Sequence, residues 1–143
     1  LDPALFAGAT AALAAPFRGQ GITHVVAVES RGFILGAPVA QELEAAFVPV
    51  RKPGRLPRDV VREEYALEYG TDVLEMHVAA LAGVGGVLVL AAVLATGGTA
   101  AATCRLVERV GASVAACAFL IELEALGGRM RLAGRRVESL LML

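Results

Sequence analysis

The sequence has no tryptophan and almost no net charge. Thirteen Lys and Arg residues nearly balance fourteen Asp and Glu residues, which leaves a formal charge of −1 at pH 7. Proteins that bind nucleic acid or an anionic membrane through their overall field carry a clear basic excess. We therefore expect no nucleic acid and no membrane as partners, whereas a small-molecule ligand is compatible with this composition.

One short basic cluster near the C-terminus could still contact nucleic acid. Its members are Arg129, Arg131, Arg135 and Arg136. Sites for single-stranded nucleic acid combine such cations with aromatic side chains on which the bases stack, and these are missing here. We predict that the four arginines form a solvated face.

Cysteine and histidine are also scarce. The chain has two cysteines, Cys104 and Cys117, and two histidines, His24 and His77. Two thiols rarely make a disulfide framework in a chain of this size, and none of these residues has a partner at metal-ligand spacing. We predict reduced thiols, structural histidines and no metal held by protein side chains. We recognise no secretory signal and expect a cytoplasmic location.

A long uncharged stretch allows two interpretations. Residues 78–104 contain no Asp, Glu, Lys or Arg. A membrane-spanning helix needs about 20 strongly apolar residues, and a small membrane-associated protein is one hypothesis. The stretch is interrupted by glycines, however, and short apolar runs bounded by glycine are more typical of buried strands. We favour the buried strand.

Apolar strand patterns alternate with amphipathic helix patterns along the chain. Strands are predicted at 23–30, 46–50, 73–78, 86–92, 113–121 and 137–141, helices at 4–17, 32–45, 99–110 and 124–132, and a polar loop at 51–64. This alternation is typical of an α/β fold whose largely parallel central sheet is flanked by helices on both faces. A chain of 143 residues suits one core, so we expect residues 1–143 to form a single domain.

The most specific local signal is the apolar run from Val87 that ends in Thr96-Gly97-Gly98-Thr99 before a predicted helix. Glycines let a backbone approach a ligand closely, and free N–H groups at a helix start favour an anion. The segment is therefore either a phosphate-binding loop or a simple turn between strand and helix. Small glycine-rich anion nests are common, so this segment alone leaves both readings open.

Four segments together resemble the adenine-specific branch of the type I phosphoribosyltransferases. They are Glu29 to Phe33, Pro49 to Pro57, Tyr65 to Gly70 and Leu94 to Thr99, and they occur in that branch's order and spacing. The resemblance implies the corresponding α/β fold and the transfer of phosphoribosyl from phosphoribosyl pyrophosphate to adenine, giving AMP and pyrophosphate in purine salvage. It also implies a homodimer and Mg²⁺ bound mainly through the pyrophosphate of the substrate.

The same resemblance assigns residues to the phosphates of the substrate. Ser30, Arg31 and Gly32 would cradle the pyrophosphate, with added positive charge from Arg51, Lys52 and Arg55. The phosphate loop would comprise Ala95, Thr96, Gly97, Gly98 and Thr99. Arginine offers forked, charge-assisted donors that suit a polyanion. Without the resemblance, the arginines after Val50 would be read as a solvated basic loop.

The resemblance also points to a reacting centre. Glu68 and Tyr69 fall in the segment that closes over this centre in the family, where the glutamate would manage the purine proton as a general acid or base. Closure would exclude water from a cation-like sugar. The alternative is a surface glutamate beside a packing tyrosine. The resemblance runs from near Leu1 to near Leu143, so we expect the chain to lack most of the family's N-terminal hood over the purine.

One departure from the family pattern is serious. Where the family has two adjacent acidic residues that bind the ribose hydroxyls, this sequence has Ala91 and Ala92. Losing two charged hydrogen-bond partners would cost about 3 to 6 kcal/mol, or roughly a hundredfold to ten-thousandfold in rate. We expect a well-folded protein with weakened ligand affinity. The alternative function is a non-catalytic relative that binds a nucleotide or phosphoribosyl ligand in a regulatory or structural role.

Overall fold

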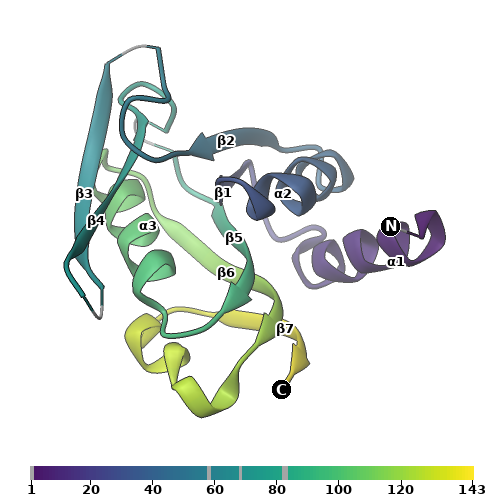
Figure 1. Ribbon diagram of the computed structural model, residues 1–143. Helices are drawn as coiled ribbons and strands as arrows, with labels where there is room; N and C mark the ends of the chain where they lie inside the picture. Colours follow the sequence, from purple (N-terminus) through teal and green to yellow (C-terminus); the bar gives the residue numbers. More distant parts are fainter. Residues whose placement is uncertain (1, 58, 68, 82–83) are drawn as a thin grey trace.

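The centre of the protein is a five-stranded parallel sheet. The computed structural model describes residues 2–57, 59–67, 69–81 and 84–143 (Figure 1). In spatial order the strands are β2 (Ala46–Val50), β1 (His24–Val28), β5 (Val87–Leu94), β6 (Val114–Glu122) and β7 (Val137–Met142). Every neighbouring pair is parallel. The predicted α/β class with a parallel sheet is confirmed.

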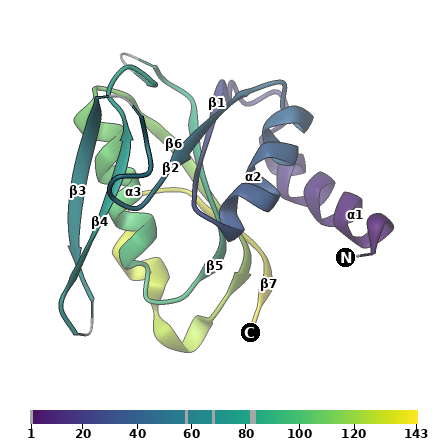
Figure 2. The same ribbon diagram turned by 45° about the horizontal axis from the view of Figure 1, so that its top comes forward.

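Two layers cover the sheet. Helices α1 (Pro3–Ala14) and α2 (Arg31–Glu42) lie on one face, with the short 3-10 helix η1 (Ala15–Phe17) after α1. Helix α3 (Gly98–Arg109) lies on the opposite face, between the sheet and an antiparallel hairpin of β3 (Val60–Ala66) and β4 (Thr71–His77), as Figures 1 and 2 show. The prediction of helices on both faces is therefore correct.

The central strand β5 shows why the uncharged stretch exists. Val87 and Val89 are buried in the core that contains α3 and the hairpin, whereas Leu88 and Leu90 are buried in the core beneath α1 and α2. Successive strand residues point to opposite faces, so a strand covered on both sides is apolar at every position. Within the described part of the chain, no helix is long and apolar enough to cross a membrane.

Two predicted elements are wrong in detail. The expected loop at 51–64 already contains the beginning of β3, whose charged residues hid its strand character. The expected helix at 124–132 is instead two 3-10 turns, η2 (Glu124–Leu126) and η3 (Gly128–Leu132). Gly127 separates them in the left-handed conformation, with φ of 64°, and this conformation ends a helix.

Candidate active site

A pocket lies where the chain changes direction across the sheet. After β1 the chain turns to β2 on one side, and β5 later pairs with the other side of β1, with Ala27 opposite Leu90. In open parallel sheets, ligands bind beyond the strand ends at such a switch point. A cavity of ≈ 370 Å³ occurs here. Its lining comprises Val28, Glu29, Arg31, Gly32 and the continuous run from Ala91 to Ala100.

The glycine-rich segment after β5 forms one wall of this pocket. Gly97 has φ of 88° and immediately precedes α3, and its carbonyl accepts the first helical hydrogen bond, from Ala101 N–H. The N–H groups of the first helical turn have no partner within the helix, and the helix dipole adds positive potential there. This wall therefore presents N–H groups without an intrahelical partner and a positive potential, and five predicted residues line it: Ala95, Thr96, Gly97, Gly98 and Thr99.

The loop is held by a glycine that sequence reasoning missed. A Cβ on Gly97 would lie 2.4 Å from the carbonyl oxygen of Gly128, and a Cβ on Gly128 would lie 2.3 Å from the carbonyl oxygen of Ala95. Both contacts are far too short for a real side chain. The segment from Ala95 to Thr99, called the phosphate loop after its predicted role, thus rests directly on the start of η3. Gly128 is 31 positions beyond Gly97, and no local pattern connects them.

The turn after β1 supplies a second helix start. Arg31 and Gly32 lie in the first turn of α2, and both line the pocket. Gly32 is buried, and a Cβ there would lie 3.5 Å from Ala27 Cβ and 3.6 Å from Leu90 O, so α2 packs closely on the sheet. Ser30 is the exposed N-cap residue and is not part of the lining. Two helix N-termini therefore face one cavity.

Two of the predicted basic residues after β2 do not line the pocket but bind Glu29, which does. Arg51 Nε and the Lys52 backbone N–H both donate to Glu29 Oε1, at 3.3 and 2.7 Å. Glu29 lines the pocket, whereas Arg51 and Lys52 do not. The Lys52 ammonium pairs with Asp72 on β4. Arg55 is exposed in the loop that follows. The structure therefore brings Arg51 and Lys52 to the site's edge through Glu29.

A tyrosine that sequence reasoning did not single out connects the hairpin to the phosphate loop. Thr99 Oγ1 donates to Tyr65 Oη at 3.3 Å, and Tyr65 Oη donates to Asp72 Oδ2 at 3.3 Å. Lys52 Nζ also donates to Tyr65 Oη, at 3.5 Å. The hydrogen bond from Lys52 is the main cause that holds the pKa of Asp72 below its usual value. Thr99, Tyr65, Asp72 and Lys52 thus form one polar chain.

A second cavity of ≈ 360 Å³ lies on the hairpin side of the loop. Its lining combines residues 65–67 of the hairpin with Thr96, Gly98, Thr99 and Arg131. Arg131 was predicted to belong to a solvated face, and its side chain is exposed, but it also borders the phosphate loop. Its position depends on the η3 turn, which the sequence did not predict.

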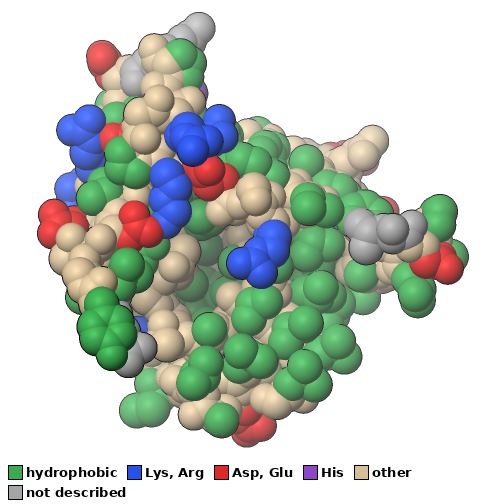
Figure 3. Space-filling model, in the orientation of Figure 1, with side chains coloured by type: hydrophobic (Ala, Val, Ile, Leu, Met, Phe, Trp, Pro, Cys, Tyr) green, Lys and Arg blue, Asp and Glu red, His purple; other side chains and the backbone are tan. Residues whose placement is uncertain are grey.

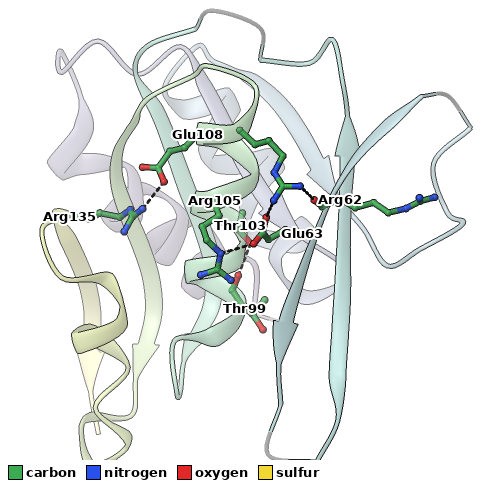
Figure 4. Close-up of polar contacts among 8 residues, drawn as sticks. Arg62, Glu63, Thr99, Thr103, Arg105, Glu108 and Arg135 are labelled. Carbon is green, nitrogen blue, oxygen red and sulfur yellow. Dashed lines mark hydrogen bonds and ion pairs between the residues drawn. The ribbon is translucent and has the colours of Figure 1, made fainter.

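An ionic clamp fixes the hairpin to α3 (Figure 4). Glu63 on β3 is buried and accepts from Arg105 Nε at 2.7 Å and from Arg109 Nη2 at 2.5 Å, both on α3. Arg109 Nη1 also donates to the Arg62 carbonyl at 2.7 Å. Thr103 Oγ1 donates to the carbonyl of Thr99 at 2.8 Å. The contacts of Arg105 and Arg109 hold β3 against the later turns of α3, whereas the bond from Thr103 to Thr99 lies within α3 itself.

Comparisons with known proteins identify the family. Residues 2–134 match the phosphoribosyl transferase domain family. Adenine phosphoribosyltransferase of Myxococcus xanthus is 54% identical, over 98% of this chain and 76% of the relative. The chain belongs to the adenine phosphoribosyltransferase family. The enzyme of Methylococcus capsulatus is 57% identical, over 98% of this chain and 82% of the relative. The crystal structure of the Thermoanaerobacter pseudethanolicus enzyme has a TM-score of 0.95 at 44% identity, covering 99% of this chain and 83% of that one.

Of the two residues predicted for the reacting centre of this phosphoribosyltransferase, the structure describes one, Tyr69. Glu68 lies outside the described residues. Tyr69 is 88% exposed in the turn between β3 and β4, which the hydrogen bond from Leu67 N–H to Gly70 O closes at 2.9 Å. Tyr69 does not line either cavity beside the phosphate loop. Its predicted role in covering the substrate stays a prediction.

The two alanines that depart from the family pattern lie in the pocket itself. Ala91 and Ala92 are half-buried at the end of β5 and line the cavity together with exposed Val93. Each packs at the margin of a different hydrophobic core. Between the two helix starts, the pocket therefore has an apolar floor.

The pocket does not fit a Mg²⁺ ion held by protein side chains. Among the described residues, Glu29 is the one carboxylate on the lining, and its Oε1 already accepts from Arg51 and Lys52. No group of three or more His, Cys, Asp or Glu side chains that could hold a metal occurs within the described parts of the chain. Mg²⁺ prefers oxygen ligands and commonly reaches protein sites on substrate phosphates.

Proposed function

We propose that this chain transfers phosphoribosyl from phosphoribosyl pyrophosphate to adenine, giving AMP and pyrophosphate in purine salvage. The observation that carries the proposal is the pocket at the β1–β5 switch point, where two helix N-termini face one cavity. A substrate with phosphate groups at both ends of one sugar matches two separated anion sites. Relatives more than 50% identical that carry the enzyme's name favour catalysis over the alternative of a non-catalytic binding protein.

The two anion sites suggest how the substrate is oriented. The 5-phosphate would bind the loop from Ala95 to Thr99, through backbone N–H groups and threonine hydroxyls. The pyrophosphate would bind the start of α2 at Ser30, Arg31 and Gly32. Arg51, Lys52 and Arg55 would add positive charge from the adjoining loop, which reduces the cost of bringing a polyanion into the cavity. The sugar would then lie across Ala91 and Ala92.

The reaction then proceeds at C1 of the sugar. The bond from C1 to the pyrophosphate oxygen breaks, a bond from adenine N9 to C1 forms, and N9 loses its proton. We propose Glu68 as the residue that manages the purine proton and Tyr69 as part of the segment that covers the site. The positive charge that develops on the sugar has no carboxylate at position 91 or 92 beside it, so turnover is slow.

Further proposals concern the state of the protein. Mg²⁺ would be part of the substrate, bound through its pyrophosphate. Residues 1–143 would form one phosphoribosyltransferase domain, act in the cytoplasm and assemble as a homodimer. Light scattering on a size-exclusion column tests the homodimer, because a dimer doubles the measured mass.

Titration of phosphoribosyl pyrophosphate with and without EDTA tests the role of Mg²⁺. Equal affinity in both conditions would contradict the proposal that Mg²⁺ binds with the substrate.

The test of the function is a product analysis. The purified chain is incubated with Mg²⁺, phosphoribosyl pyrophosphate and either adenine or hypoxanthine, and nucleotide and pyrophosphate are quantified together. We expect AMP and pyrophosphate in equal amounts, and at least tenfold less product from hypoxanthine. Thr99→Val, purified identically, is the control for contaminating host enzyme, since its activity should fall. Nucleotide formation that is the same in both proteins, or absent from both, would contradict the proposal.

A further inference from the structure

The pocket is polar at its ends and apolar in its middle. The ends are the helix starts at Arg31–Gly32 and at Gly97–Thr99, which offer N–H groups and hydroxyls. The middle is the end of β5, where the side chains of Ala91, Ala92 and Val93 offer only carbon. A ligand that spans the two ends must place its central part over this floor.

Two polar side chains on the lining, Glu29 and Thr99, already have partners within the protein, and the other two, Arg31 and Thr96, belong to the two ends of the pocket. Glu29 Oε1 accepts from Arg51 Nε and from the Lys52 backbone N–H, on the side of the basic loop. The Thr99 hydroxyl donates to Tyr65 Oη. Alanine and valine side chains cannot form hydrogen bonds, so the side chains of the floor neither strengthen the binding of a ligand hydroxyl group nor lose a partner when that group is absent.

The apolar floor affects which sugars the pocket can distinguish. A site built to hydrogen-bond a hydroxyl rejects the analogue that lacks it by several orders of magnitude, because the protein group is left unpaired. A hydrophobic surface discriminates only weakly between two ligands that differ by one hydroxyl. We propose that this pocket binds 5-phosphorylated sugars without distinguishing ribose from 2-deoxyribose, and that Ala91 and Ala92 determine this. The inference rests on the proposed function for the placement of the sugar.

The inference is tested by calorimetric titration with 5′-AMP and 2′-deoxy-5′-AMP. For the unmodified chain we expect the two dissociation constants to agree within about threefold. For the Ala91→Asp, Ala92→Asp double variant we expect a preference for AMP of at least tenfold, because each carboxylate can accept from a sugar hydroxyl. The single variants are measured as well, so that one unstable protein does not end the test.

Two matched variants separate charge from other effects. Ala91→Asn, Ala92→Asn has similar volume without the charge, and we expect a smaller preference than in the aspartate variant. Ala115→Asp places the same charge on an exposed position of β6, away from the lining, and should leave the ratio unchanged.

The outcomes are distinguishable. Equal binding in the unmodified chain and a preference in the aspartate variant support the inference. If the unmodified chain prefers AMP by tenfold or more, or if the aspartate variants show no preference, the inference is overturned while the proposed function stands. If the chain binds neither nucleotide, the proposed function fails and the inference fails with it.

Discussion

At the scale of single residues, the phosphate loop depends on two glycines in contact. Gly97 needs its left-handed backbone to begin α3, and Gly128 must come within van der Waals distance of the Ala95 carbonyl. Gly97 could be recognised in the sequence because it belongs to a compact motif. Gly128 could not, because its requirement arises only when η3 folds back beneath the loop.

Gly128→Ala should displace the phosphate loop. The added Cβ would meet Ala95 O at 2.3 Å and Leu94 Cδ1 at 2.9 Å, so backbone must shift. Overpacking of this kind costs about 1–3 kcal/mol in the free energy of unfolding. We also expect at least a tenfold loss of AMP affinity, measured by calorimetry beside urea unfolding.

The matched control is Gly8→Ala in α1, where nothing lies within 4 Å of the added Cβ. It should be neutral or stabilising by up to about 1 kcal/mol, because alanine favours helix. Equal AMP affinity in Gly128→Ala and the unmodified chain would show that the loop does not depend on this contact.

At the scale of elements, the position of the hairpin follows from charge rather than from apolar pattern. Strand β3 presents Glu63 to two arginines on α3, and Tyr65 from the same strand face is buried beside Thr99. A sequence pattern with Arg62, Glu63 and Glu64 in succession predicts a solvated loop, since buried carboxylates are rare unless paired. The arginines that pair with Glu63 are more than 40 residues away in the sequence, so no local pattern indicates that this carboxylate is buried in a strand.

Glu63→Gln should loosen the hairpin. Removal of the charge leaves Arg105 and Arg109 facing a neutral amide. We expect the free energy of unfolding to fall by about 1–3 kcal/mol. The loss is modest because both arginines are partly exposed to water. Glu138→Gln is the control, since its pair with Arg136 is exposed on both sides and should contribute less than about 1 kcal/mol. Chemical unfolding of the three proteins measures the difference, and equal effects of the two substitutions would contradict the clamp.

At the scale of the whole molecule, two buried carboxylates each connect separate elements of the fold. Glu75 is 2% exposed, pairs with Arg62 and accepts from Gly54 N–H at 3.0 Å. Glu122 is 3% exposed and accepts from Arg129 Nη2 and from Ser139 Oγ, both at 2.7 Å. Hydrogen bonds from the arginines are the main cause that lowers the pKa of each carboxyl below the ordinary 4.5.

These shifts give stability a defined pH dependence. Because the folded pKa values are lowered, the stabilisation is fully present above the unfolded value near 4.5 and is lost as pH falls through the folded values. Urea unfolding at pH 7, 5, 4 and 3 should show a plateau and then a decline. Glu122→Gln should be less stable at pH 7 and decline less steeply. An equally steep decline in the variant would exclude Glu122 as a contributor.

The overall architecture was largely accessible from the sequence, for reasons that are themselves structural. Strands such as β5 are apolar at every position because both faces are covered, and the helices that follow carry amphipathic patterns. Of the site residues predicted from the sequence, those that line the pocket are Arg31, Gly32, Ala91, Ala92 and Ala95 to Thr99. They lie at the start of α2, at the end of β5 and in the loop after β5, so each group is continuous in the sequence. It could not place Tyr65, Gly128 or Arg131, whose roles depend on segments that meet only in the folded chain.

The most direct test of the account is the rate of AMP formation by the unmodified chain and by the Ala91→Asp, Ala92→Asp double variant. Both are assayed with saturating adenine and phosphoribosyl pyrophosphate in Mg²⁺, at high protein concentration. We expect slow but measurable turnover in the unmodified chain and a gain of about a hundredfold or more in the variant, since two carboxylates would then face the charged sugar. No detectable AMP formation by either protein, or a folded double variant with no increase in rate, would contradict this expectation.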